Sequence, residues 1–306
     1  MTMIYSEKEL INIIKSTLNS PYIGDDCAYL KDLDIVITQD SLVEGVHFSP
    51  DFITPYQLGY KSVMVNISDV CASGAEPLYL TVSLSLPKNI ENDFVEEFYK
   101  GAKEALQDAQ IVGGDITGSD KVYISVTAIG KTKGRRISSR SNAKSGYKII
   151  VSGEHGNSAK GLELLAHDSA RGEGKGEKFI QAHLMPQAQR EFSRKIAENI
   201  NTDYAMMDTS DGLADALMQI AKASRVKVSV DTSKIPHDAS VEIDKVLYGG
   251  EDYQLVAAVP EDFLNKHDDF CYTIIGEVKS SDEAGLEIDG TFYADIQNKL
   301  YNHFKE

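Results

Sequence analysis

The chain has 306 residues, enough for one large domain or two medium domains that each bury a core. Hydrophobic residues make up 42% and charged residues 25%, which is ordinary for a globular protein, and no apolar run approaches the ~20 residues that cross a bilayer. The formal net charge of −16 disfavours nucleic acid and anionic membranes as partners, although it permits an anionic substrate wherever acids hold a metal ion.

The first half of the chain predicts strands that alternate with helices. An amphipathic pattern beginning near Ser6 predicts an N-terminal helix and is unlike a signal peptide, because acids and lysines interrupt its apolar residues. The elements that follow are a strand over 34–39, a helix over 55–72, a strand over 78–87, a helix over 91–108 and a strand over 122–130. This alternation predicts a mixed α/β domain.

The composition then changes over residues 131–146, which are basic, polar and almost free of apolar side chains. We place a domain boundary there, with domains at 1–135 and 136–306. The segment is either a solvated linker or a place where one arginine, Arg140, reaches a phosphate. The second half predicts strands over 147–153, 226–230, 254–259 and 272–278, helices over 158–167 and 187–201, a flexible loop over 167–178, and a strand end, turn and helix over 205–224.

Acidic residues recur directly after apolar strands or beside paired glycines, which is where α/β folds usually bind ligands. Aspartates in this setting are natural ligands for Mg²⁺, which prefers oxygen atoms in octahedral geometry. The set is Asp26, Asp40, Asp69, Asp115, Asp208 and Asp211. Thr38 and Ser210 can add hydroxyl groups for an ion or a phosphate. Together these residues predict several Mg²⁺ ions held against a polyphosphate.

Most of these acids also have a purely structural explanation. Asp211 is well placed to cap a helix, and Asp115 follows two glycines and can serve a turn. Asp69 is different, since an acid near the end of a helix opposes the helix dipole, which favours a functional role. The chain has no P-loop and no protein-kinase motif, and its glycine-rich segment 153–161 is either a simple turn or an anion cradle.

The cysteines are few and scattered, at Cys27, Cys71 and Cys271. Their odd number and spacing argue against a disulfide framework and a zinc site, and they are typical of a reducing cytoplasm. We interpret Cys27 and Cys71 as small packing residues. We therefore expect a cytoplasmic protein.

These motifs, taken in this order, resemble the thiamine-monophosphate kinase family of the aminoimidazole-ribonucleotide-synthetase superfamily. The resemblance runs from about Ile23 to Val256 and is carried by IGDDCA, TQDSLVEGVHF, KSVMVNISDVCASGAEPLYLTVSLSLP, VGGDITGS, SRSNAKSGYKIIVSG, GNSAKGLELL, MDTSDGLADAL and YGGEDYQL. It implies a two-domain α/β fold and a homodimer whose N-terminal domains pair into a β-barrel. It also implies transfer of the γ-phosphoryl group of ATP to thiamine monophosphate with the help of several Mg²⁺ ions.

The resemblance also implies roles for single residues. The metal ligands would be Asp26, Thr38, Asp40, Asp69, Asp115, Asp208 and Asp211. The ATP contacts would be Tyr99, Gly114, Arg140 and Ser210, and the pocket for thiamine monophosphate would contain His47, Glu251 and Tyr301. Gln39 departs from the family, which often has a hydroxyl residue there. Gln39 either serves a metal through its backbone carbonyl alone or weakens one metal site.

Transfer between two phosphates needs positioning and charge neutralisation, so we expect neither a phospho-enzyme nor a general base. Two alternatives remain open. Another ATP-dependent synthetase of the superfamily is the first, but one that uses selenide needs a reactive cysteine in a glycine-rich setting, whereas Cys27 follows two aspartates. A non-enzymatic module that binds divalent cations is the second, and it predicts EF-hand-like loops that the sequence lacks.

Overall fold

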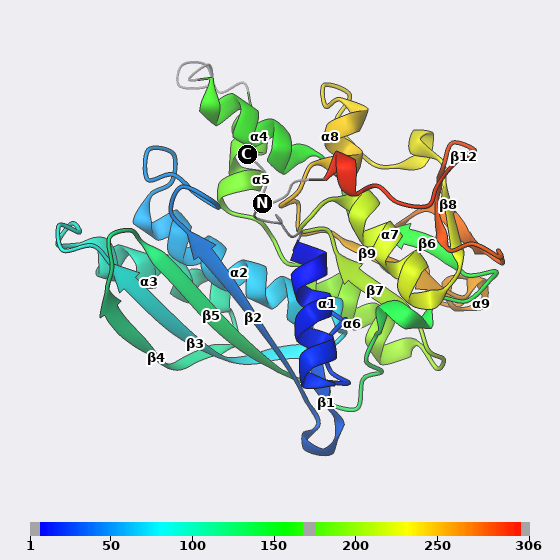
Figure 1. The fold of residues 1–306 in the computed structure, drawn as a ribbon, viewed down its shortest axis with the longest axis horizontal. Helices are drawn as coiled ribbons and strands as arrows, with labels where there is room; N and C mark the ends of the chain where they lie inside the picture. Colours follow the sequence, from blue (N-terminus) through cyan, green and yellow to red (C-terminus); the bar gives the residue numbers. More distant parts are fainter. Residues whose placement is uncertain (1–6, 168–175, 301–306) are drawn as a thin grey trace.

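The computed structural model describes residues 7–167 and 176–300, which form two β-sheets with helices packed around them (Figure 1). The predicted mixed α/β class is confirmed. No helix in the described part of the chain is long and apolar enough to cross a membrane.

The N-terminal half contains a five-stranded sheet in the order β1-β2-β5-β3-β4. Its strands are β1 (Ala28–Leu30), β2 (Ile35–Val43), β3 (Glu76–Leu86), β4 (Gln110–Gly118) and β5 (Tyr123–Lys131). All neighbours are antiparallel except β3 and β4, which run parallel. Side chains alternate along β3, so that Leu80, Val82 and Leu84 are buried while Tyr79 is exposed on the other face.

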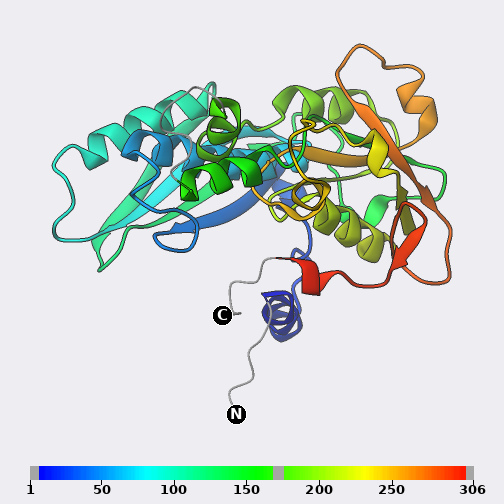
Figure 2. The ribbon, with the colours of Figure 1, turned by 90° about the horizontal axis from the view of Figure 1, so that it is seen from above.

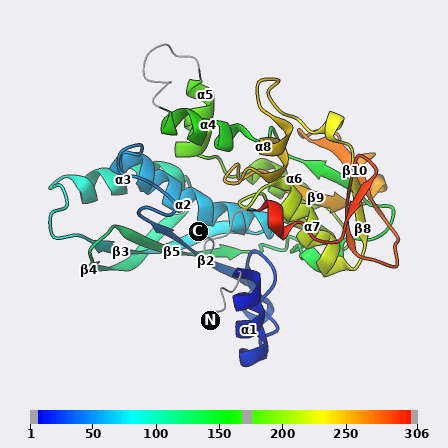
Figure 3. The same ribbon diagram turned by 45° about the horizontal axis from the view of Figure 1, so that its top comes forward.

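Two helices, α2 (Pro55–Ala72) and α3 (Phe94–Leu106), cover one face of this sheet (Figure 2). Helix α2 starts at a capping box in which Thr54 and Gln57 bond each other's backbone, with a proline at the first helical position. It is buried along most of its length because it continues past the sheet to contact β7 and α6 of the C-terminal half (Figure 3). The end of α2 therefore lies between the two halves of the molecule.

The C-terminal half contains a seven-stranded sheet in the order β12-β11-β8-β10-β6-β9-β7. Its strands are β6 (Lys148–Val151), β7 (Ala205–Asp208), β8 (Lys227–Val230), β9 (Leu255–Val259), β10 (Thr273–Lys279), β11 (Gly285–Ile288) and β12 (Thr291–Tyr293). Its neighbours are antiparallel apart from β8 and β11. Strands β6 and β9 and the edge strand β7 bury side chains on both faces, which explains their mostly apolar sequences.

One hydrophobic core lies on each face of this second sheet. Helix α7 (Leu213–Ser224) packs on one face, and α6 (Arg190–Asn199) packs on the other, where its core is continuous with that of the first sheet. The remaining helices are α1 (Glu7–Leu18), α4 (Asn157–Ala166), α5 (Glu177–Leu184), α8 (Ile243–Tyr248) and α9 (Glu261–Leu264), with short 3-10 turns at η1 (Lys31–Leu33), η2 (Arg140–Asn142), η3 (Thr232–Lys234) and η4 (Gln297–Lys299).

The turn that was one alternative for Gly113 and Gly114 is not present, and the loop prediction is tested only at its end. The segment around Gly113 and Gly114 is the middle of strand β4 and not a turn, because its parallel pairing with β3 supplies the hydrogen bonds that a glycine-rich sequence does not by itself favour. The loop predicted over 167–178 lies mostly outside the described residues, and α5 begins within it at Glu177.

Candidate active site

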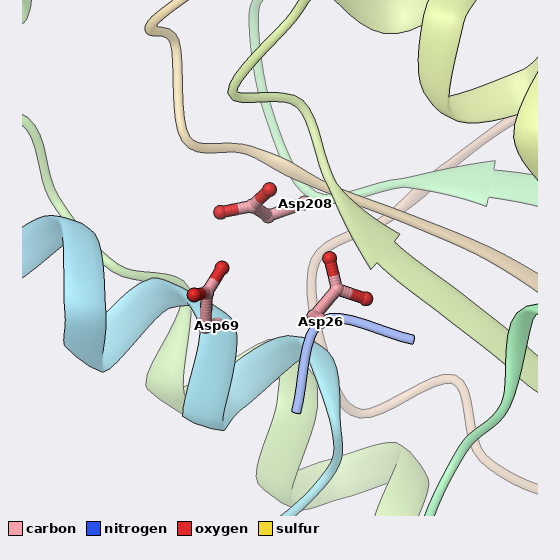
Figure 4. A group of neighbouring side chains, drawn as sticks. All are labelled: Asp26, Asp69 and Asp208. Carbon is pink, nitrogen blue, oxygen red and sulfur yellow. The ribbon is translucent and has the colours of Figure 1, made fainter. Parts of the chain in front are cut away.

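Three aspartates that are far apart in the sequence converge between the two sheets (Figure 4). Asp26 lies just before β1, Asp69 lies in the last turn of α2, and Asp208 is the last residue of β7. One carboxylate oxygen from each lies within 4.8 Å of the others. Three like charges this close repel one another strongly, so the arrangement is favourable only with bound protons or cations.

Burial is the main cause of the unusual electrostatics of this cluster. Burial, together with the neighbouring carboxylates, raises the pKa of Asp208 to about 7 and the pKa of Asp69 well above its ordinary value. Burial also raises the pKa of Asp26, although Arg140 opposes the shift. The pKa of Asp40 rises to about 6 because of burial and the charges of Asp211 and Asp26. A divalent cation would replace the protons that these groups otherwise retain.

Neighbouring hydroxyl groups orient two of the three carboxylates. Thr38 Oγ1 donates to Asp69 Oδ2 at 2.7 Å, and Ser68 Oγ donates to Asp208 Oδ2 at 2.6 Å. The backbone N–H of Ser210 donates to the other oxygen of Asp208 at 3.3 Å. Each carboxylate keeps further lone pairs for a ligand. Such fixed oxygen atoms fit Mg²⁺, which binds through a few carboxylates and keeps several waters.

Arg140 borders the cluster from the short turn η2. Its Nη2 atom lies 2.9 Å from Asp26 Oδ1, and its Nη1 donates to Gln219 Oε1 at 2.6 Å. Its Nε atom is buried and has no hydrogen-bond partner. Arg140 therefore has an unused donor beside the acids, which suits the prediction that it contacts a phosphate.

A cavity of about 1350 Å³ opens over the cluster. It is lined by these predicted site residues: Asp26, Thr38, Gln39, Asp40, His47, Asp69, Arg140, Ser210, Asp211 and Glu251. Asp208 is buried just beneath it. Ligand pockets usually measure ~300–1,000 Å³, so there is room here for a nucleotide and a second substrate.

Glu251 and His47 lie in the same cavity but outside the three-aspartate cluster. Glu251 adopts a left-handed backbone conformation (φ +64°), and its N–H donates to the carbonyl oxygen of Ser210 at 2.6 Å. His47 Nδ1 accepts a hydrogen bond from the backbone N–H of Val43 at 3.1 Å, at the end of β2. The cavity thus combines an acid cluster with a second polar region.

Comparison with known proteins assigns this geometry to a family. The family models described as AIR synthase related protein, N-terminal domain and C-terminal domain match residues 24–132 and 144–289. A thiamine-monophosphate kinase from Aquifex aeolicus is 37% identical and aligns over 96% of this chain and 97% of its own length. The chain belongs to the thiamine-monophosphate kinase family.

Other relatives agree with this assignment. A thiamine-monophosphate kinase from Bacillus subtilis is 32% identical over 92% of this chain and 93% of its own length. The solved structure of AaThiL complexed with AMPPCP and TMP has a TM-score of 0.90 at 35% identity, and the match covers 99% of this chain and 100% of that chain. The two-domain fold of the AIR synthase related proteins is therefore confirmed. Hydrogenase maturation protein HypE is 22% identical with a TM-score of 0.67 and shares the fold.

Some predicted site residues of this kinase-family chain lie away from the cavity. Gly114 and Asp115 belong to the exposed edge strand β4, and Tyr99 packs against Phe98 in α3. None of these predicted residues lines the cavity. Tyr301 lies outside the described residues. A single chain therefore does not bring Tyr99, Gly114 and Asp115 to the acid cluster.

The sequence analysis did not identify the two side chains that lie against the Glu251 carboxylate. Lys61 is fully buried in α2 and pairs with Glu251, while His183 of α5 lies 3.3 Å from an oxygen of the same carboxylate. A usable signal existed in α2, since Lys61, Val65 and Asp69 are spaced by four residues and so share one helical face. A lysine on the cavity face of an otherwise apolar helix is informative.

Proposed function

We propose that this protein transfers the γ-phosphoryl group of ATP to thiamine monophosphate and forms thiamine diphosphate and ADP. The observation that carries the proposal is one cavity that holds both a convergent acid cluster and a separate polar region around Glu251 and His47. The family supports it, and so does the related AaThiL structure, which is complexed with AMPPCP and TMP.

The acid cluster fits a metal ion on the chemistry of its donors. Its residues are buried, their pKa values are raised, and their oxygens are oriented by hydroxyl groups. Mg²⁺ held by Asp26, Asp69 and Asp208, with Thr38, Asp40, Asp211 and the Gln39 carbonyl near it, would neutralise phosphate charge during transfer. More than one ion is part of the proposal, since the lining acids exceed the ligands that one hydrated Mg²⁺ uses.

The chain's own side chains orient the two substrates. Arg140 lines the cavity beside Asp26 and can contact a phosphate of ATP through its guanidinium group, and Ser210 lies between Asp208 and Glu251. Glu251 presents an anionic carboxylate to a cationic thiazolium ring, and His47 lies close enough to share that part of the cavity. An acceptor phosphate is already a competent nucleophile, so no side chain has to remove a proton from it.

A homodimer is part of the proposal. Strand β4 is a free sheet edge, and every residue in it except Ile111 is exposed, including the apolar side chains of Val112 and Ile116. An edge of this kind favours pairing with another chain. Pairing of two N-terminal sheets into a barrel would cover it. We propose that Gly114 and Asp115 then serve the acid cluster of the partner subunit.

Three further assignments remain predictions. The domain division at residues 135 and 136 is supported by the gap between the two family matches, which runs from 132 to 144. Roles for Tyr99 in ATP binding and Tyr301 in acceptor binding rest on the motif resemblance. A cytoplasmic location is supported by the cysteines, all three of which are unpaired.

The experiment is a side-by-side assay of thiamine monophosphate and free thiamine as acceptors of phosphate from ATP, with and without Mg²⁺. We expect Mg²⁺-dependent formation of thiamine diphosphate and slow use of thiamine, because the proposed transfer needs an acceptor phosphate that shares the metal ions, whereas a hydroxyl acceptor must first lose a proton. Equal or faster turnover of free thiamine would overturn the proposal, as would full activity in EDTA.

A further inference from the structure

A buried lysine joins the two halves of the molecule beside Glu251. This is the part of the cavity where the proposed function places thiamine monophosphate. Lys61 comes from α2, and only 1% of its side chain is exposed. Its Nζ atom lies 3.2 Å from each of the two carboxylate oxygens of Glu251, which comes from the loop before β9. A buried ammonium group is unfavourable without a partner, so this pair is a built feature of the site.

A second side chain holds the same carboxylate from α5. His183 Nδ1 lies 3.3 Å from Glu251 Oε2 and 3.0 Å from Ser158 Oγ. Burial and the charge of Lys61 lower the pKa of His183 to about 4, so its ring is neutral at neutral pH. The hydrogen bond with Ser158 fixes the ring, and the neutral ring lies against the Glu251 carboxylate. Glu251 therefore has one cationic donor, Lys61, and one neutral neighbour, His183.

The backbone around Glu251 is fixed as well. Both Glu251 and Tyr253 have positive φ angles, which side chains other than glycine rarely adopt. The Asp252 carboxylate between them accepts the backbone N–H groups of Gly156 and Ser158 at 2.5 and 2.8 Å, at the start of α4. The position of Glu251 is thus determined by contacts on three helices, α2, α4 and α5.

Part of the Glu251 side chain still faces the cavity. Its exposed fraction is 25%, compared with 1% for Lys61 and 8% for His183. All three side chains line the cavity, but Glu251 is the most exposed of them, so its carboxylate is the group most accessible to a ligand there. A rigid, ionised group needs no rearrangement when a cationic ligand binds, which improves affinity through preorganisation.

We propose that Lys61 and His183 are positioning residues that set acceptor affinity by holding the Glu251 carboxylate in place. This inference rests on the proposed function for the identity of the acceptor. The two residues act through Glu251, and they do not act on the nucleotide. Their effect should therefore depend on whether residue 251 carries a carboxylate.

The test is a double-mutant cycle with Lys61→Met, Glu251→Gln and the combined variant. Binding of thiamine monophosphate is measured by calorimetry, and KM values for acceptor and ATP are measured in parallel. We expect Lys61→Met to weaken acceptor binding by ~10-fold or more while the KM for ATP changes less than ~2-fold. In the Glu251→Gln background, the same change should add less than ~2-fold, because coupled residues are not additive. Lys234→Met, which removes an exposed ion pair with Asp231, is the control.

Equal losses in both backgrounds would overturn the proposal, as would equal effects on acceptor and ATP or no effect at all. If Lys61→Met does not fold, as judged by thermal unfolding, His183→Gln replaces it in the same cycle with the same expectations. The proposed function fails separately, when the wild-type protein does not phosphorylate thiamine monophosphate. The calorimetric cycle still tests the positioning role in that case, and absence of acceptor binding to the wild type would overturn both.

Discussion

Replacing Asp208 by asparagine should stabilise the metal-free protein and inactivate the enzyme at the same time. Only 1% of Asp208 is exposed, and burial with the charge of Asp26 raises its pKa from 3.8 to about 7. Asparagine has nearly the same shape, can accept from the Ser210 N–H and can donate to Ser68 Oγ. The substitution therefore removes a charge without opening a cavity.

The size of the effect follows from proton linkage. A folded carboxyl group with a raised pKa binds protons more tightly than the unfolded chain does, so its contribution to stability is lost as the pH rises through about 7. The raised pKa of Asp208 costs the folded state on the order of 4 kcal/mol at pH 8, where the carboxyl is ionised, and about half of that at pH 5.5, where it is protonated. Allowing for relaxation around the cluster, we expect Asp208→Asn to gain ~2 kcal/mol at pH 8, a rise in Tm of ~3 °C for a chain of 306 residues.

The assay is thermal unfolding in EDTA at pH 8 and pH 5.5, followed by the same measurement with Mg²⁺. The gain should shrink at pH 5.5, and Mg²⁺ should stabilise the wild type much more than the variant. Turnover should fall ~100-fold or more, since a metal ligand is lost. The control is Asp203→Asn, at an exposed ion pair with Arg136, which should change Tm by less than ~1 °C. An unchanged or lower Tm for Asp208→Asn in EDTA at pH 8 would refute the electrostatic reasoning, and wild-type turnover would refute the metal site.

The remaining predictions concern the other predicted ligands. Asp40→Ala and Asp115→Ala should each abolish most turnover without unfolding the protein, and near-normal kinetics at saturating Mg²⁺ would contradict the assignment. An equal mixture of the two variants, refolded or co-expressed so that chains exchange, should recover about a quarter of wild-type activity, because half of the dimers are mixed and each has one intact site. No recovery would argue against a contribution from the partner subunit. His47→Ala and Glu251→Gln should raise the KM for thiamine monophosphate much more than the KM for ATP, because each removes a contact that is made equally in the ground state and the transition state. A selective loss of ATP affinity would contradict the assignment of these two residues to the acceptor pocket.

Motifs of the sequence were sufficient to predict the family. Aspartates directly after apolar strands predicted a metal centre, and the order of the motifs predicted the family that the comparisons confirmed. Long periodic segments such as α2 and α3 were also predictable, because a helical or alternating pattern is a local property. Ten of the predicted site residues line one cavity.

Only the tertiary structure decided which acids act together. Asp26, Asp69 and Asp208 converge because the end of α2 packs between the two halves of the molecule, and no local pattern encodes that contact. Strand β4 depends in the same way on its pairing with β3, which places Asp115 on a sheet edge away from the cluster. The partners of Glu251 come from distant helices and were invisible in its own segment, GGEDY. The type of a residue determines the chemistry of its side chain and is visible in the sequence. Which side chains come together depends on long-range packing and is decided only when the chain folds.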